Sequence, residues 1–251
     1  MAREARRPDT PFWVDPADVR GHRLHLGAEE SHHLLKVYRA ARDSAFEAVD
    51  GEGTLYRCVV EAVEHRAVIG RIEDRVRDAG ELAGSIHLLV GTPDPAAAEA
   101  VVTRGVPLGA TAIEFVRTER SEPWQPTDVR LVRLSRLARA ALKQSRRTRL
   151  PTISFATSLE GVMAGLPRGP RFLAEATGPP WSESASTGVS EWVVLAVGPP
   201  GGFTGGELEH LRRAGFQYIS LGPNRLATED AAGALLALCR QVFLTRARAR
   251  H

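Results

Sequence analysis

Short runs of apolar residues, separated by turn-forming residues, dominate the first third of the chain. Runs of strand length occur at 22–26, 45–49 and 55–60. The segment Asp50-Gly51-Glu52-Gly53, between the second and third runs, is typical of a turn. One helix is expected at 32–38, capped by Ser31 and apolar on one side. This pattern predicts a small β-rich domain, folded as a barrel, over residues 1–80.

Beyond residue 80, apolar runs of strand length alternate with amphipathic segments of helix length. Strands are expected at 86–90, 112–116, 153–156, 171–175, 192–197 and 218–221. Helices are expected at 95–106, 127–146, 205–214 and 229–246. The segment 178–190, rich in Gly, Pro and Ser, is expected to be an exposed loop. Residues 81–251 should therefore form an α/β domain with a largely parallel sheet, helices on both faces and ligands at the carboxyl ends of the strands.

Composition and charge are those of an ordinary globular protein. Apolar residues make up 43% of the chain and charged residues 25%, and the net charge is +3, which excludes disordered and fibrous classes. Cys58 and Cys239 lie in apolar surroundings without metal-binding spacing, so we expect two buried thiols in a reducing compartment and no metal site. No apolar stretch has the length of a membrane span, and the charged residues 1–7 are not followed by an apolar segment, so we expect a cytoplasmic protein without a membrane partner.

The most informative local feature is the strand expected at 192–197, which runs into Gly198-Pro199-Pro200-Gly201-Gly202. Thr204 and Glu207 follow with the spacing of a helix capping box. Glycines let a backbone approach a ligand closely. A phosphate-binding loop would need Gly-Lys-Ser/Thr and a dinucleotide fingerprint would need GxGxxG, and neither occurs here. The pattern indicates a pocket that is lined by backbone and binds a ligand other than these nucleotides. An ordinary turn between a strand and a helix, without a ligand, explains the glycines equally well.

A second loop, from Gly222 to Ala227, follows the strand expected at 218–221 and leads into the last helix. Thr228 is placed to cap this helix, and Glu229 and Asp230 occupy its first turn, where the helix dipole favours carboxylates. Simple stabilisation of the helix is the better interpretation for Asp230. For Glu229, stabilisation of the helix and a catalytic role are equally good interpretations.

Several separated motifs occur in an order that resembles one protein family. The motifs are Leu195-Ala196-Val197-Gly198-Pro199-Pro200-Gly201-Gly202-Phe203-Thr204 with Glu207, Ala214-Gly215-Phe216, Leu221-Gly222-Pro223, Leu226 with Thr228-Glu229 and Ala231, the segment from His32 to Arg39, Thr118-Glu119-Arg120-Ser121, and Gln144-Ser145 with Arg147. Together they make the chain similar to the 16S ribosomal RNA uridine-N3 methyltransferases. Because the motifs are spread over most of the chain, the resemblance is far more specific than one glycine-rich loop.

The resemblance implies a PUA-like RNA-binding barrel followed by a SPOUT domain, an α/β fold whose C-terminal segment forms a trefoil knot. It also implies S-adenosylmethionine as the cofactor, the 16S ribosomal RNA of the small subunit as a partner, and a homodimer. The family holds its cofactor mainly with backbone groups of two loops. The corresponding candidates here are Glu175, Gly198, Pro200, Gly201, Gly202, Leu221, Gly222, Pro223 and Leu226.

The implied reaction is methyl transfer to N3 of an unpaired or extruded uridine. On the matching positions, Glu229 is expected to orient the base or handle its proton, and Arg120 to support the uracil or a phosphate. The candidates for RNA binding are Arg7, His33, Lys36, Arg39 and Arg147. A solvated charged surface is the ordinary alternative for the arginines of the helix expected at 127–146.

The sequence departs from the family at several polar positions. Pro200 stands where the family usually has glutamate, and Ala227 stands where it usually has arginine. Arg225 is displaced by one position from a second family arginine. The departures at Pro200 and Ala227 keep open a knotted RNA-binding or ribosome-assembly protein without activity. Two further alternatives are a methyltransferase of the same class with a different RNA target and an unknotted nucleotide-binding enzyme.

Overall fold

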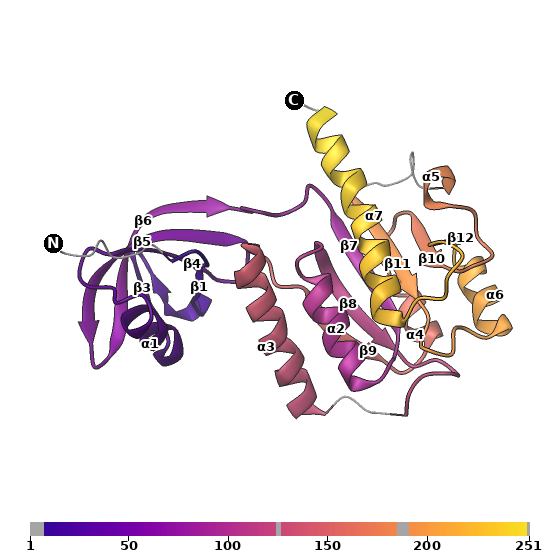
Figure 1. The fold of residues 1–251 in the computed structure, drawn as a ribbon, viewed down its shortest axis with the longest axis horizontal. Coiled ribbons are helices and arrows are strands. Elements are labelled where there is room, and N and C mark those ends of the chain that lie inside the picture. Colours follow the sequence, from indigo (N-terminus) through magenta and orange to yellow (C-terminus); the bar gives the residue numbers. More distant parts are fainter. Residues whose placement is uncertain (1–7, 124–126, 185–190, 250–251) are drawn as a thin grey trace. The chain divides into compact units, whose positions relative to one another are not determined.

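The computed structural model describes residues 8–123, 127–184 and 191–249, which fall into two compact units (Figure 1). One unit extends to Glu81 and also includes Arg139–Leu150, whereas the other comprises Leu82–Ala138 and the chain from Pro151 onward. The sequence places 139–150 in the second domain. The structure differs because side chains of this segment bond to the first unit, where Lys143 pairs with Glu30 and Arg146 with Glu47.

The first unit is built on a six-stranded sheet in the order β1-β4-β5-β6-β3-β2. Its strands are β1 (Phe12–Trp13), β2 (Val19–Arg20), β3 (Arg23–His25), β4 (Ala45–Val49), β5 (Thr54–Glu64) and β6 (Ala67–Arg77), accompanied by the 3-10 helix η1 (Pro16–Asp18) and the helix α1 (Ala28–Lys36). The pairings are antiparallel except for β1 with β4. Its core contains Phe12 and Phe46, whose rings meet edge to face 6.1 Å apart.

The expected cap of the first helix is wrong. Ser31 lies inside α1 and is fully buried, and the helix begins at Ala28 after Gly27. The Ser31 hydroxyl donates to the carbonyl oxygen of Leu26 and accepts from the backbone N–H of Val68, both at 2.9 Å. A buried hydroxyl needs hydrogen-bond partners. Ser31 finds them in Leu26 and Val68, so it connects the helix to β6 and does not cap the start of the helix.

The second unit contains a six-stranded sheet in the order β12-β10-β11-β7-β8-β9, in which every pairing is parallel. Its strands are β7 (Ser85–Gly91), β8 (Ala110–Val116), β9 (Thr152–Ala156), β10 (Arg171–Ala174), β11 (Trp192–Val197) and β12 (Phe216–Ile219). Its helices are α2 (Pro95–Gly105), α3 (Asp128–Ser145), α4 (Leu159–Met163), α5 (Trp181–Ser184), α6 (Gly205–Arg213) and α7 (Thr228–Ala249). The helix α3 belongs to both units, because the division falls after Ala138. The short α5 lies within the segment expected to be a plain loop.

Helices cover both faces of this sheet, as predicted. Side chains on successive residues of β11 point to opposite faces, and all of its residues from Val193 to Val197 are buried. Val194 and Ala196 pack with residues of α4 and α6, including Leu211. The helices α2 and α7 pack against each other and cover the other face (Figure 1). Because β10, β11 and β12 are parallel neighbours, the loops that leave their carboxyl ends meet at one edge of the sheet.

Both cysteines are buried free thiols, which confirms that prediction. Burial disfavours the charged thiolate and raises the pKa of Cys58 and of Cys239 to about 12, so both stay protonated near neutral pH. Within the described residues, no helix is both long and apolar enough to cross a membrane.

Candidate functional site

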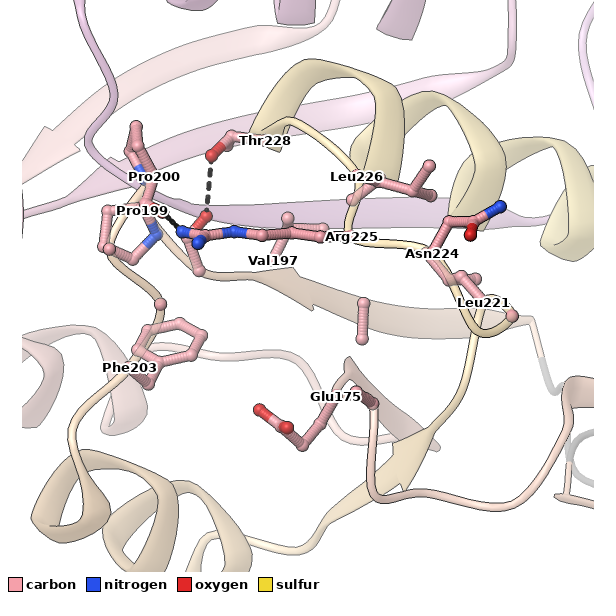
Figure 2. Close-up of a pocket in the computed structure, with 17 residues that line it drawn as sticks. Glu175, Val197, Pro199, Pro200, Phe203, Leu221, Asn224, Arg225, Leu226 and Thr228 are labelled. Atoms are coloured by element: carbon pink, nitrogen blue, oxygen red, sulfur yellow. Dashed lines mark hydrogen bonds between the residues drawn. The ribbon is translucent and has the colours of Figure 1, made fainter.

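A cavity of about 340 Å³ lies at the edge of the second sheet where the loops after β10, β11 and β12 meet the start of α7 (Figure 2). The lining residues are Ala174, Glu175, Ala176, Val197, Gly198, Pro199, Pro200, Gly201, Gly202, Phe203, Leu221, Gly222, Asn224, Arg225, Leu226, Thr228 and Ala231. The carboxyl edge of a parallel sheet is the usual ligand position in open α/β folds.

The first loop of the cavity, Gly198–Gly202, follows directly after β11. It turns on a hydrogen bond from the backbone N–H of Gly202 to the carbonyl oxygen of Pro199, at 2.7 Å. Gly202 has φ +71°, a conformation that side chains with a Cβ rarely adopt, and a Cβ there would meet no other atom within 4 Å. The predicted capping box follows this loop and is confirmed, since Thr204 and Glu207 exchange both hydrogen bonds at the start of α6.

Side chains from outside the first loop bind three of its carbonyl oxygens. Thr228 Oγ1 donates to Gly198 O at 3.0 Å, Arg225 Nη2 to Pro200 O at 2.5 Å, and Arg120 Nη1 to Gly201 O at 3.0 Å. The carbonyl of Pro199 accepts from within the loop. These bonds hold the loop from outside and occupy the carbonyl oxygens of Gly198, Pro200 and Gly201.

The second loop, from Gly222 to Ala227, reaches back over the first. Thr228, expected to cap the last helix, is instead its first residue, and its hydroxyl donates to the first loop. Figure 2 shows Arg225 extended from the second loop toward Pro199 and Pro200. Leu226 stays 38% exposed at the cavity. The two loops are therefore joined at two points.

Glu175 and Arg225 are the charged side chains among the described residues that line the cavity, and they face it from opposite walls (Figure 2). Apolar side chains occupy much of the remaining wall, among them Val197, Phe203 and Leu221. A ligand with a flat apolar ring could contact the apolar side chains, and its hydroxyl or charged groups could bind to Glu175 or Arg225. Among the described residues, no group of three or more His, Cys, Asp or Glu side chains could hold a metal ion.

Eight of the nine residues expected to contact a cofactor line this one cavity, and Pro223 is the exception. The two catalytic candidates do not line it. Glu229 is half-buried in the first turn of α7, next to Thr228. Arg120 is exposed and bonds to Gly201 of the first loop.

The candidates for RNA binding separate into two kinds. Lys36 and Arg39 are exposed, and the His33 ring packs against Phe12 and Tyr38 at centroid distances of 5.7 and 5.4 Å. Arg147 requires a correction, because it is 2% exposed and both its Nε and Nη2 donate to Glu81. A buried guanidinium in such a pair cannot reach RNA. Arg7 lies outside the described residues.

Sequence reasoning missed Arg225, Asn224 and Phe203 as residues of the cavity. Phe203 is part of the first motif, and Asn224 and Arg225 lie between the motif residues Pro223 and Leu226, so their positions were available signals. The contact of Arg225 with Pro200 carried no such signal, because it joins residues 25 positions apart through the fold.

Comparison with known proteins identifies matching families for both parts of the chain. A family model described as an RNA methyltransferase domain matches residues 81–240, and one described as an RNA methyltransferase PUA domain matches residues 26–73. The chain is 27% identical to proteins named ribosomal RNA small subunit methyltransferase E from a Synechocystis strain, with 89% of this chain and 75% of the relative covered, and from Mycobacterium bovis, with 90% and 88% covered. A crystal structure of the protein of that name from Neisseria gonorrhoeae, bound to S-adenosyl methionine, is also similar. It has the same fold, with a TM-score of 0.81 and 23% sequence identity, and the match covers 93% of this chain and 97% of that chain.

Proposed function

Because the chain belongs to the RNA methyltransferase family, we propose that it transfers a methyl group from S-adenosylmethionine to N3 of a uridine in the 16S RNA of the small ribosomal subunit. The observation that carries the proposal is the cavity between two loops that are bonded to each other at the carboxyl edge of the sheet. The curated relatives act, by their name, on small-subunit ribosomal RNA. The protein would then act in the cytoplasm, where ribosomal subunits are assembled.

The residues of the cavity suit S-adenosylmethionine. Its volume of about 340 Å³ falls at the lower end of the range for small-molecule sites. Val197, Leu221 and Leu226 offer apolar contacts to an adenine ring, and the Glu175 carboxylate can accept from ribose hydroxyls or pair with a positively charged group. The first loop can approach the ligand closely because it is rich in glycine.

The bound cofactor would supply an activated methyl group on its sulfonium sulfur, which becomes a neutral thioether when the methyl group is transferred. The chain has to bring N3 of an unpaired uridine in line with that methyl group and to remove the N3 proton as the new C–N bond forms. Glu229 is the proposed proton acceptor because it matches the family motif; it follows Thr228 of the cavity wall in the first turn of α7 but does not itself line the cavity.

Lys36 and Arg39 are the proposed RNA contacts of the first unit. Replacing both by alanine should weaken binding to ribosomal RNA and reduce the slope of log K against log salt by about one for each phosphate that the protein no longer neutralises. The matched control is Arg20→Ala, which removes another exposed arginine of the same unit. Filter binding at several salt concentrations measures both quantities, and equal slopes for the double variant and the control would remove these residues from the RNA interface.

The knot and the dimer are further parts of the proposal. A threaded C-terminal segment would have to lie against the first loop, and the bonds of Arg225 and Thr228 to that loop are consistent with this arrangement. A homodimer would give cover to apolar side chains such as Leu226 and Leu244, each 38% exposed. Light scattering on the purified protein measures its mass directly, and a monomer at micromolar concentration would contradict the dimer.

One observation favours the alternative of an RNA-binding protein without activity. Pro200, which stands where the family usually has glutamate, lies in the cavity wall, so this wall lacks both a carboxylate and a backbone N–H at that position. Titration calorimetry of the RNA-free protein with S-adenosylmethionine separates the two functions. We expect saturable binding, and an absence of binding would contradict the methyltransferase proposal.

A further inference from the structure

Arg120 and its neighbour Glu119 follow β8 and do not line the cavity, but Arg120 contacts the first loop and Glu119 contacts the start of α6 directly after it. Arg120 Nη1 donates to the carbonyl oxygen of Gly201 at 3.0 Å. A charged donor makes a stronger hydrogen bond to a carbonyl than a neutral one does. The contact joins residues 81 positions apart, so it holds two distant segments together.

The aliphatic part of Arg120 explains why residue 201 is glycine. A Cβ atom on Gly201 would lie 2.9 Å from Cβ and 3.2 Å from Cδ of Arg120, closer than unbonded carbon atoms normally approach. Gly202 differs, because a Cβ there meets no atom within 4 Å and its φ of +71° alone calls for glycine. Two adjacent glycines therefore have different roles, and Gly201 is needed to seat the side chain of Arg120.

Glu119 bonds to the start of α6, which follows the first loop. Its backbone N–H donates to Glu207 Oε1 at 2.8 Å, and its carboxylate accepts from Thr204 Oγ1 at 3.2 Å. Glu207 Oε2 at the same time accepts from the backbone N–H of Thr204 at 2.8 Å. The segment after β8 thus bonds to the capping box of α6 as well as to Gly201, so it contacts both the first loop and the helix that follows it.

The segment that carries Glu119 and Arg120 is itself held in place. Thr118 N–H donates to Ser121 Oγ at 2.9 Å, and Ser121 N–H donates to Thr118 O at 3.2 Å. Glu122 N–H donates to the carbonyl oxygen of Thr92 after β7, at 3.1 Å. All four residues of the Thr118–Ser121 motif therefore contact protein atoms, and the motif is anchored to the sheet.

We propose that Glu119 and Arg120 are positioning residues, which hold the first loop and the start of α6 in the conformation that binds the cofactor. Arg120 acts through Gly201 and not on the uracil or a phosphate of the RNA. This inference rests on the proposed function, since it assigns S-adenosylmethionine to the cavity that the first loop lines. It replaces the catalytic role expected for Arg120 from the sequence.

The test is the affinity for S-adenosylmethionine in the absence of RNA. Arg120→Met keeps most of the aliphatic chain but removes the bond to Gly201 O, and should raise the Kd about fivefold, the effect of one missing hydrogen bond. Arg120→Lys, which retains a donor, should recover part of the affinity. The control Arg117→Met removes an exposed arginine of the same segment and should leave the Kd unchanged. An unchanged Kd for Arg120→Met with a reduced kcat would overturn the inference and indicate that Arg120 contacts the uracil or a phosphate of the RNA.

Hydrogen exchange in the ligand-free protein tests the positioning independently of the cofactor. The backbone amides of Gly201–Thr204 should exchange several times faster in Arg120→Met than in the unmodified protein or in Arg117→Met. Wild-type protein that fails to bind S-adenosylmethionine would contradict the proposed function, whereas equal exchange rates in all three proteins would contradict only the positioning role.

Discussion

Gly91→Ala is expected to reduce S-adenosylmethionine affinity by more than tenfold and to destabilise the fold by about 2 kcal/mol, a typical cost of overpacking. Gly91 ends β7 and lies against the first loop of the cavity. A Cβ on Gly91 would lie 2.4 Å from Cδ and 2.6 Å from the backbone nitrogen of Pro199. The proline ring and its backbone cannot turn aside as a flexible side chain would, so the loop itself has to move.

The control for this variant is Gly206→Ala in α6, where an added Cβ meets no atom within 4 Å. Calorimetry measures the affinity, and urea unfolding measures the stability of both variants. If Gly91→Ala were to bind S-adenosylmethionine within twofold of the unmodified protein, the first loop could not be the rigid wall of the cofactor site.

Arg147→Met should lower the free energy of unfolding by about 3 kcal/mol, since it leaves a buried carboxylate without its ion partner. The side chains of Arg147 and Glu81 are only 3% and 8% exposed. Glu81 also accepts from the backbone N–H groups of Thr148 and Arg149, which fixes its position but does not neutralise its charge. Adding Glu81→Gln to the variant should restore part of the stability, because no charge is then left unpaired.

The neighbouring pair of Arg149 with Asp78 provides the comparison, since its side chains are 45% and 51% exposed. Arg149→Met should cost less than about 1 kcal/mol, as usual for surface pairs. Urea unfolding followed by circular dichroism measures the stability of these variants. A loss for Arg147→Met no larger than that for Arg149→Met would mean that the buried pair does not hold 139–150 in the first unit.

The sequence predicted the parallel sheet well because its strands are strongly apolar. β11 was expected at its observed bounds, and the expected β12 was displaced by two residues because Leu221 extends the apolar run beyond the last pairing. The strand β6 was missed, since charged residues such as Arg71 and Glu73 interrupt its apolar pattern on the exposed side. Ser31 was misjudged because its partners depend on tertiary structure and not on local spacing.

The candidate site was predictable to the extent that it consists of glycine-rich loops. Glycine content and strand-to-helix transitions identified both loops, and the family resemblance placed them in one pocket. The contacts of Arg225 and Arg120 with the first loop could not be predicted, because they depend on how distant segments cross in space. Arg147 was expected at an RNA surface since charge alone does not distinguish an exposed arginine from one paired in the interior.

Transfer of a methyl group to ribosomal RNA is the most direct test of the central proposal. The protein is incubated with S-adenosylmethionine carrying an isotope-labelled methyl group and with small ribosomal subunits or 16S RNA that lack the modification, and the RNA is digested to nucleosides for mass spectrometry. We predict labelled 3-methyluridine. Protein that binds S-adenosylmethionine but leaves every uridine unlabelled, or labels another nucleoside, would contradict the proposal.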